Sequence, residues 1–378
     1  MIKNINKEHI LILFGADSKL RWGRSFQLGK AFRALGHNVM YIDLPVSLLT
    51  SMRYACENEN QIHNVEGVDV FRPYFGLPYI QFSFLRSINR KNIVHQICKV
   101  LNKTHFIPSI LWVYSPYDPY ISNFIKNVYN PKKVVYDCAD DRVALAKMNK
   151  GMKVALKVNE LEKKLCKFCS SVVCITQNLK SKKHYLHKNM HVVPNGIDLE
   201  MFNCDKILGD NPYTQFCSKI ILYLGTIGDW VDQDLIIESA RRYPSYSFVC
   251  IGPCSTDISK MRLIDNVYIM KSVDYGKVPT YIYYADLCIV PFLKNEHTLS
   301  LDSLKVLQYL AMKKNVLSTY YSSSNYFDGL IHVAFSKYEF INKISELMGV
   351  NYAIKIDSES VIGSYLWKSI ASKALMLI

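Results

Sequence analysis

Short apolar runs alternate with longer amphipathic segments along the chain, as in α/β proteins. Residues 9–14 (HILILF) predict a buried strand, and a helix is predicted over residues 25–36, where Gly36 supplies the left-handed cap. Residues 38–43 (NVMYID) predict the next strand. Strand, loop, helix and strand in this order form a βαβ unit, which favours a parallel sheet.

The same alternation continues and then starts again in the second half. Further strands are predicted at residues 109–114, 133–137, 171–176, 219–225, 247–252, 267–270, 287–291 and 315–319. An irregular stretch with Pro and Gly, residues 203–217, precedes the restart. We therefore expect two doubly wound α/β domains facing a cleft, the default position of a binding site.

Length and composition agree with two folded domains. The chain has 378 residues, 49% hydrophobic and 21% charged, which argues against a disordered chain. We expect an N-terminal domain over residues 1–200, a C-terminal domain over residues 201–357, and a last helix over residues 358–378. This helix carries Trp367 and is expected to return to the first domain.

The charge is uneven. Residues 1–200 hold 29 Lys and Arg against 15 Asp and Glu, whereas residues 201–378 hold 17 of each, so the net charge of +14 lies in the first half. This asymmetry indicates an anionic partner, such as a membrane surface, a phosphate-bearing substrate or nucleic acid. The alternative is a charge that serves solubility alone.

Targeting signals and cysteines bear on location. No run approaches the roughly 18 apolar residues of a membrane-spanning helix, and the first residues lack the apolar core of a secretory signal. The 11 cysteines show no framework spacing, which is typical of free thiols in a reducing compartment. We expect a cytoplasmic protein.

Two motifs carry a resemblance to a known superfamily. Residues 191–202 (HVVPNGIDLEMF) contain a P-N-G-I-D stretch with a trailing Phe, and residues 304–311 (LKVLQYLA) are followed by residues 316–319 (VLST). Together with the two-domain plan, these segments resemble the GT-B glycosyltransferases over nearly the whole chain. The resemblance implies a hexosyltransferase-type enzyme with two Rossmann-like domains.

Three other stretches resemble one branch of that superfamily. They are residues 136–141 (YDCADD), 222–230 (LYLGTIGDW) and 289–292 (IVPF). They are similar to bacterial surface-polysaccharide transferases of the teichuronic-acid type and to the xanthan glucuronosyltransferase. This implies transfer of a sugar from a UDP- or GDP-linked donor to a glycan acceptor bound by the first domain, in capsule, exopolysaccharide or other cell-envelope synthesis.

Such a donor needs a site for its diphosphate, whose charge must be stabilised as it leaves. Lys305 matches the superfamily's phosphate-contacting position, and the turn at Gly225, Thr226 and Ile227 offers backbone amides. Gln308 is expected to hydrogen-bond the donor sugar or phosphate. No metal motif is visible, so neither a metal nor another cofactor is expected. The alternative for Lys305 is a solvated helix residue, and that for the glycine turn is ordinary turn chemistry. The alternative for Gln308 is a polar residue in a helix.

The chain departs from the superfamily at several of these positions. Many retaining members carry two glutamates where Ser300 and Gln308 stand, and an Arg and a Lys where this chain has Asp229, Trp230 and Asp232. The departures put the retaining mechanism in doubt and leave more of the phosphate charge to Lys305.

An inverting transfer needs a general base for the acceptor hydroxyl. Asp137, Asp140 and Asp141 follow a predicted strand, and neighbouring carboxylates raise one another's proton affinity. We assign Asp140 as the base and Asp141 as the second candidate. The structural alternative is an N-cap for the next helix.

The loop after the first strand is expected to line the acceptor site. Its candidates are Asp17, Trp22 and Arg24, with Arg24 as a fork-shaped donor to an acceptor phosphate. The alternative for Arg24 is an exposed residue in a first helical turn.

A membrane contact is predicted for residues 78–103, which mix aromatic side chains with Arg and Lys. An aromatic and basic surface suits an anionic bilayer, where lipid-linked acceptors are presented. We therefore expect a peripheral protein on the inner face of the cell membrane. The alternative is a core helix with a solvated basic edge.

Four other functions could explain parts of the sequence. Cys166, Cys169, His184 and His187 resemble a zinc site, but a predicted strand separates the pairs, and we expect His184, Lys182, Lys183 and Lys188 on an exposed helix. A nucleic-acid binder explains the charge but lacks a motif. A non-catalytic scaffold that binds a sugar nucleotide agrees with Ser300 and Gln308 in place of the two glutamates. Sugar-nucleotide epimerisation would give the basic surface of the first domain no role.

Overall fold

The chain forms two units. The computed structural model describes residues 7–15, 17–19, 21–47, 62–76, 83–116, 118–207, 209–216, 218–302, 304–321, 324–327, 329–349 and 362–378. One unit comprises Met1–Pro194 with Trp367–Ile378, and the other comprises Asn195–Leu366. These boundaries differ from the expected ones at 200/201 and 357/358. The segment after Pro194 belongs to the second unit because the Ile197 amide donates to the Tyr365 carbonyl oxygen at 2.8 Å.

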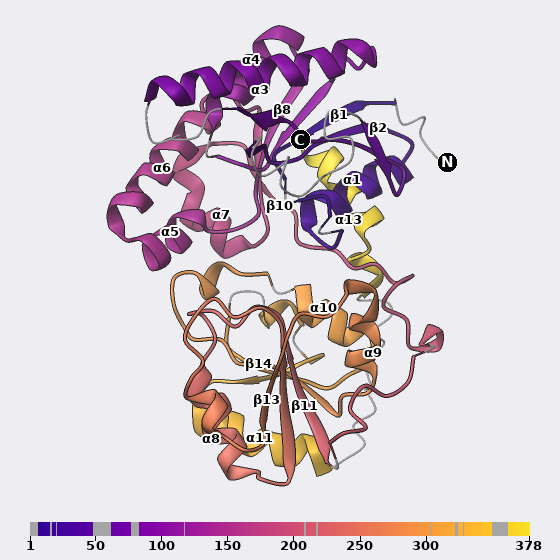
Figure 1. Ribbon diagram of the computed structural model, residues 1–378, viewed down its shortest axis with the longest axis vertical. Helices are drawn as coiled ribbons and strands as arrows, with labels where there is room; N and C mark the ends of the chain where they lie inside the picture. The colour runs from indigo at the N-terminus through magenta and orange to yellow at the C-terminus, as the bar shows by residue number, and fades with distance from the viewer. Residues whose placement is uncertain are drawn as a thin grey trace. The chain divides into compact units, whose positions relative to one another are not determined.

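The first unit is built on an eight-stranded sheet in the order β10-β9-β8-β7-β1-β2-β5-β4, in which only β4 is antiparallel to its neighbour (Figure 1). Its strands are β1 (His9–Leu13), β2 (Asn38–Ile42), β4 (His63–Val65), β5 (Val68–Phe71), β7 (Ile110–Val113), β8 (Lys133–Cys138), β9 (Ser171–Cys174) and β10 (Met190–Val192), beside a small sheet of β3 (Val46–Ser47) and β6 (Tyr74–Phe75). The order reverses between β1 and β7, which is where open parallel sheets bind ligands.

Helices cover both faces of this sheet. They are α1 (Arg24–Ala34), α3 (Ser83–Lys103), α4 (Pro119–Tyr129), α5 (Arg142–Lys150), α6 (Met152–Cys166), α7 (Gln177–Lys183) and α13 (Trp367–Leu377). Ile10 and Ile12 pack with α1 and α13, whereas Leu11 and Leu13 pack with α3, α4, α6 and α7. Successive residues of β1 thus serve opposite faces, as the continuous apolar run requires.

The second unit repeats this architecture on six parallel strands in the order β13-β12-β11-β14-β15-β16. Its elements are β11 (Lys219–Leu224), β12 (Tyr246–Ile251), β13 (Val267–Met270), β14 (Leu287–Val290), β15 (Val316–Thr319), β16 (His332–Ala334), α8 (Gln233–Arg242), α9 (Val278–Tyr283), α10 (Leu304–Ala311) and α11 (Lys337–Gly349). Here the strand order reverses between β11 and β14, so that edge is the place to look for a ligand.

Every strand predicted from the apolar runs is present, with ends that shift by no more than two residues. The pattern missed β3, β4, β5, β6, β10 and β16, which are short or carry polar residues, such as His191 in β10. Within the described residues, no helix has the length and apolar character needed to cross a bilayer. The nine cysteines of the described part are all thiols without a disulfide.

Candidate functional site

Two glycines meet at the carboxyl ends of β11 and β12. Gly225 has φ +136° and its amide donates to the Ile251 carbonyl oxygen at 2.8 Å, and Gly252 has φ +150°. A Cβ atom on Gly252 would lie 2.3 Å from the Gly225 carbonyl oxygen. Both positions therefore require glycine, and the two backbones touch at the reversal edge of the sheet.

Lys305 of α10 reaches this glycine turn. Its ammonium lies 3.2 Å from the Tyr223 hydroxyl oxygen, 4.3 Å from the Tyr223 ring centroid and 5.0 Å from the Phe292 ring centroid. A Cβ atom on Gly225 would lie 2.8 Å from Nζ. Glycine thus leaves the cation next to the bare backbone of the turn.

No carboxylate among the described residues pairs with the Lys305 ammonium, so none of them neutralises its charge. Burial lowers the pKa of Lys305 to about 7. A bound anion would restore the charged form, because an opposite charge favours the ammonium. These properties are those of an anion site that is preformed and empty of protein acids.

Only some amides of the Gly225–Gly228 turn are available to a ligand, whereas the sequence analysis expected its amides to face the diphosphate. Ile227 N donates to the Pro253 carbonyl oxygen at 2.9 Å, and Gly225 N is already bonded to Ile251. The amides of Thr226 and Gly228 make no hydrogen bond to residues that the structure describes. An anion at this turn therefore has Thr226 rather than Gly225 or Ile227 as an amide partner.

Gln308 lies one turn after Lys305 on α10, but it is buried and its amide donates to the Tyr275 hydroxyl at 3.1 Å. Tyr275 packs edge-on against Phe202, the trailing Phe of the P-N-G-I-D stretch. The helix and the motif are therefore joined through this contact. Direct contact of Gln308 with a donor stays a prediction.

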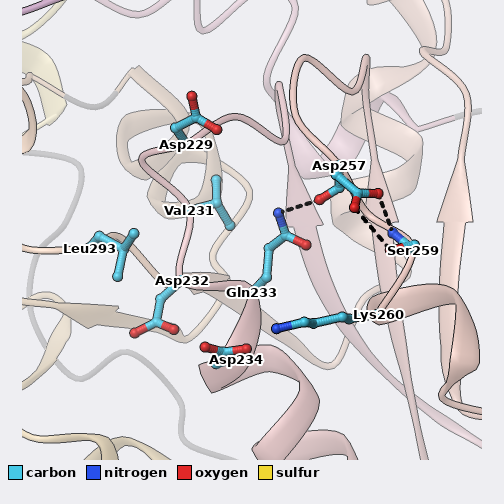
Figure 2. Close-up of a pocket in the computed structure, with 9 residues that line it drawn as sticks. All are labelled: Asp229, Val231, Asp232, Gln233, Asp234, Asp257, Ser259, Lys260 and Leu293. Carbon is cyan, nitrogen blue, oxygen red and sulfur yellow. Dashed lines mark hydrogen bonds between the residues drawn. The ribbon is translucent and has the colours of Figure 1, made fainter. Parts of the chain in front are cut away.

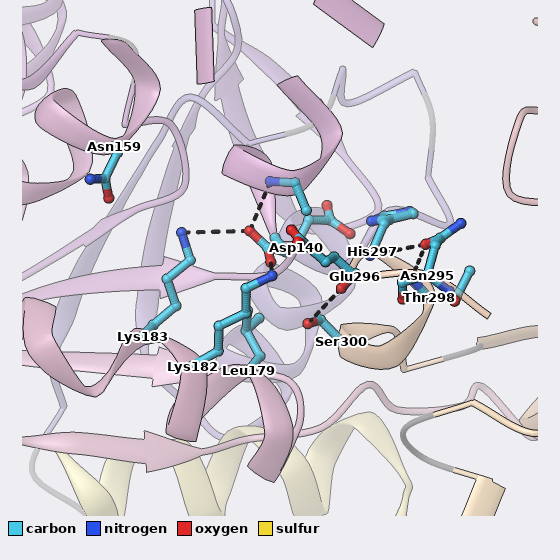
Figure 3. Close-up of polar contacts among 12 residues, drawn as sticks. Asp140, Asn159, Leu179, Lys182, Lys183, Asn295, Glu296, His297, Thr298 and Ser300 are labelled. Atoms are coloured by element: carbon cyan, nitrogen blue, oxygen red, sulfur yellow. Dashed lines mark hydrogen bonds and ion pairs between the residues drawn. The ribbon is translucent and has the colours of Figure 1, made fainter. Parts of the chain in front are cut away.

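Ser300 lies in a tight turn (Figure 3). Its hydroxyl donates to the Glu296 carbonyl oxygen at 3.3 Å, and the Asn295 side chain accepts from the amides of His297 and Thr298. Ser300 is 2% exposed. A buried hydroxyl bonded to its own turn is a structural element here.

A pocket of about 300 Å³ lies at the start of α8 (Figure 2). It is lined by Asp229, Val231, Asp232, Gln233, Asp234, Asp257, Ser259, Lys260 and Leu293. Asp232 caps α8 by accepting from the Leu235 amide at 2.9 Å, and Lys337 lies 3.4 Å from it. The carboxylates disfavour a diphosphate in this pocket, because like charges repel.

In the first unit, Arg24 is part of a buried ion pair. Its Nε donates to Asp137 Oδ1 and Oδ2 at 3.1 and 3.2 Å, and its Nη1 donates to the Pro194 carbonyl oxygen at 2.8 Å. Trp112 Nε1 also donates to Asp137, at 3.0 Å. The fork donor expected for an acceptor phosphate is therefore directed at the protein itself, since its side chain is only 8% exposed.

Asp141 is a helix cap inside a buried charge network. Its Oδ1 accepts from the Ala144 amide at 3.1 Å, while Lys182 and Lys183 reach its carboxylate from α7 at 2.6 and 3.6 Å. Burial works to raise the pKa of Asp141, but the two lysines and the amide hold it below its usual range. A carboxylate with a lowered pKa is a poor general base, so the structure argues against Asp141 in that role.

Lys183 corrects another expectation, because it is 2% exposed rather than part of an exposed helix. Its ammonium pairs with Glu162 at 2.5 Å, and the Tyr136 hydroxyl donates to the same carboxylate at 2.8 Å. These charges outweigh burial and raise the pKa of Lys183. The sequence analysis did not single out Glu162. It lies 21 residues before Lys183 in a different helix, so no local pattern joins the two.

Asp140 differs from its two neighbours. Its half-buried carboxylate makes no hydrogen bond or ion pair with any residue that the structure describes. Burial raises the pKa of Asp140, with Asp137 and Asp141 adding to the rise and Arg142 and Arg24 opposing it. At the carboxyl end of β8, Asp140 thus has a raised pKa and a carboxylate whose lone pairs no described residue occupies.

Asp17 lies beside an arginine that the sequence did not single out. Arg72 bonds both Asp17 and Asp43, the latter at 2.7 Å, and Ser18 donates to Asp43 from its amide and its hydroxyl. This cluster fixes the loop after β1. Trp22, 38% exposed, lies in the same loop, and its contact with an acceptor stays a prediction.

The cysteine and histidine pairs do not form a metal site in the described part, where no group of three or more potential ligands comes together. Burial raises the pKa of Cys166 to about 12. That shift disfavours the thiolate that a metal requires.

Comparisons with known proteins agree with this architecture. The sucrose-phosphate synthase from Thermosynechococcus elongatus superposes with a TM-score of 0.72 over 97% of both chains, at 13% identity. The catalytic domain of starch synthase IV from Arabidopsis thaliana, solved with ADP and acarbose, gives 0.65 over 98% of both chains, also at 13% identity. The chain has the GT-B fold.

No family model matches the chain. A comparison with curated sequences gives one relative. A proposed teichuronic acid biosynthesis glycosyltransferase of Bacillus subtilis is 26% identical over 226 residues, which is 55% of this chain and 55% of that protein. The chain thus spans about half the length of the curated relative that it matches. The resemblance to surface-polysaccharide transferases holds for this GT-B chain.

The buried network of the first unit can be tested by stability. Replacing Lys183 by Met should lower the free energy of unfolding by about 3–5 kcal/mol, because Glu162 would be left as a buried, unpaired charge. Lys163→Met is the matched control. Its ion pair with Glu160 is exposed on both sides, 43% and 61%, so its loss should leave the free energy of unfolding nearly unchanged. Urea unfolding near neutral pH measures both, and equal losses would contradict the network.

Proposed function

We propose that this GT-B chain is a glycosyltransferase that moves a sugar from a nucleotide-diphosphate donor to an acceptor hydroxyl. The second unit binds the donor and the first binds the acceptor. The observation that carries the proposal is the Lys305 ammonium, held beside the Gly225 backbone with no carboxylate of the described part paired to it.

The donor half follows from charge. As the sugar leaves, the diphosphate gains negative charge, and a cation that is already in place stabilises it without reorganisation. The Tyr223 hydroxyl donates to the Thr226 carbonyl oxygen at 2.8 Å, which leaves its lone pairs for the Lys305 ammonium and fixes the turn. We propose that this cation serves without a metal ion, and that turnover persists in EDTA.

The acceptor half rests on Asp140. The acceptor hydroxyl must lose its proton as it attacks, and a carboxylate with a raised pKa takes that proton more readily than an ordinary one. The buried partners of Asp137 and Asp141 keep the strand end rigid around it. We propose Asp140 as the general base, as an inverting transfer requires.

The acceptor class is proposed from the relatives. The Bacillus subtilis relative belongs to teichuronic acid biosynthesis, which favours a lipid-linked glycan of a bacterial surface polysaccharide. The names of the sucrose-phosphate and trehalose-phosphate synthases among the structural neighbours make a sugar phosphate the second candidate. Turnover with membrane extract against turnover with soluble sugar phosphates separates the two acceptors.

Donor binding should depend on pH through Lys305. Above its pKa of about 7 the empty site loses its proton, so the Kd of UDP should rise by up to about tenfold per pH unit between pH 7 and 9, where UDP is fully ionised. Lys305→Arg should keep the charge and flatten this dependence, whereas Lys305→Met should weaken binding at every pH. Isothermal titration calorimetry with UDP measures all three proteins.

Several outcomes would contradict the donor site. UDP binding that is equal in the wild type and Lys305→Met would remove Lys305 from it. Donor binding without release of nucleoside diphosphate, with either acceptor class, would favour a non-catalytic scaffold. Tight, salt-sensitive binding of nucleic acid with no response to UDP would favour the nucleic-acid alternative.

Asp140 can be tested separately from the donor. Asp140→Asn should lower kcat by about 10²–10⁴-fold and leave the Kd of UDP unchanged, because the amide cannot accept the proton. The matched control is Asp141→Asn, which should lower the melting temperature but keep the pH dependence of kcat/KM. Turnover retained in Asp140→Asn would place the base elsewhere.

A further inference from the structure

The outer face of α4 carries a stripe of exposed apolar side chains. Tyr120, Phe124 and Val128 are 56%, 47% and 52% exposed, and their spacing of four places them in one row along the helix. The opposite face of α4, with Ile121 and Ile125, is buried in the core. Because the helix already has its own core contacts, the exposed stripe needs another explanation.

Helix α3 adds to this row. Phe84 and Ile88, again four residues apart, are 71% and 39% exposed. The Arg90 guanidinium stacks 4.3 Å over the Tyr120 ring, which joins the first part of α3 to the start of α4. We call Phe84, Ile88, Tyr120, Phe124 and Val128 the α3–α4 surface. Contiguous exposed apolar side chains of this kind mark an interaction site.

The segment that carries this surface is rich in basic residues. Residues 83–133 contain eight Lys and Arg and a single acid, Asp118. Asp118 is paired with Arg90 at 2.6 Å, so it does not offset the remaining cations. Lys91 and Lys99 are exposed on the same helix as Phe84. A basic field with aromatic and aliphatic side chains inside it complements an anionic surface that also has an apolar interior.

We propose that the α3–α4 surface docks the first unit on an anionic lipid bilayer. Aromatic and aliphatic side chains enter the boundary between headgroups and acyl chains, and the surrounding lysines and arginines bind the headgroups. The apolar members distinguish a bilayer from nucleic acid, whose phosphates would use the cations alone. The sequence placed this contact over residues 78–103, of which residues 78–82 lie outside the described part. The structure adds the stripe of α4.

The proposal is tested with the full-length chain and sedimentation of vesicles. Vesicles of phosphatidylcholine with about one third phosphatidylglycerol should bind the chain, and vesicles of phosphatidylcholine alone should bind it at least about tenfold more weakly. Replacing Phe84 and Phe124 together by Ser should reduce binding to anionic vesicles about tenfold. Phe335→Ser in the second unit is the matched control, since Phe335 is 75% exposed, and it should bind like the wild type.

A charge variant keeps the test valid if the serine variant folds poorly. Lys91→Glu with Lys99→Glu should also reduce binding and weaken its salt dependence. Equal binding by the variants and the wild type, or no binding to anionic vesicles, would overturn the proposal. So would dimers in solution that the serine variant abolishes, since the surface would then contact a second copy. UDP binding should be unchanged in every variant, so failure here is distinct from failure of the proposed transfer.

Discussion

The second unit holds a lysine ammonium, Lys305, that no carboxylate of the described part pairs with. Keeping a lysine away from water costs free energy, and this cost shows as a pKa of about 7 for Lys305. Two aromatic faces and one phenol oxygen stabilise the cation, but none carries a negative charge. The fold keeps this arrangement by requiring glycine at position 225, where a side chain would displace Nζ. Such a site gains most from an anionic ligand.

The first unit solves the opposite problem, that of buried acids. Asp137 is neutralised by Arg24 and Trp112, and Asp141 is neutralised by two lysines and a helix amide. These pairs are costly to break, because a lone charge would remain. Asp140 lies between them without such a partner, and the rigid pairs on both sides limit how the loop can relax. Asp140 is thus the acid at this strand end that no described residue pairs with.

Much of the fold could be predicted from the sequence, because apolar runs of four to six residues report buried parallel strands directly. Short edge strands such as β16 lack that signal. The functional groups were harder to assign, since their state depends on partners far away in the sequence. The residues next to Lys183 in the sequence do not indicate that it pairs with Glu162, and those next to Arg24 do not indicate that it pairs with Asp137. The resemblance to the superfamily pointed to Lys305, and the position after a predicted strand pointed to Asp140. Their roles stay predictions.

The lysines of this chain act in three ways that a net charge cannot separate. Lys183 neutralises a buried acid, Glu162, so this pair adds nothing to the excess of 14 charges or to an external field. Lys91 and Lys99 lie at the surface, where their charge is screened by salt yet open to a membrane. Lys305 lies between these limits, half-buried and without a carboxylate. Burial and pairing, rather than residue type, therefore decide which cation stabilises the fold, which attracts a surface and which binds a ligand.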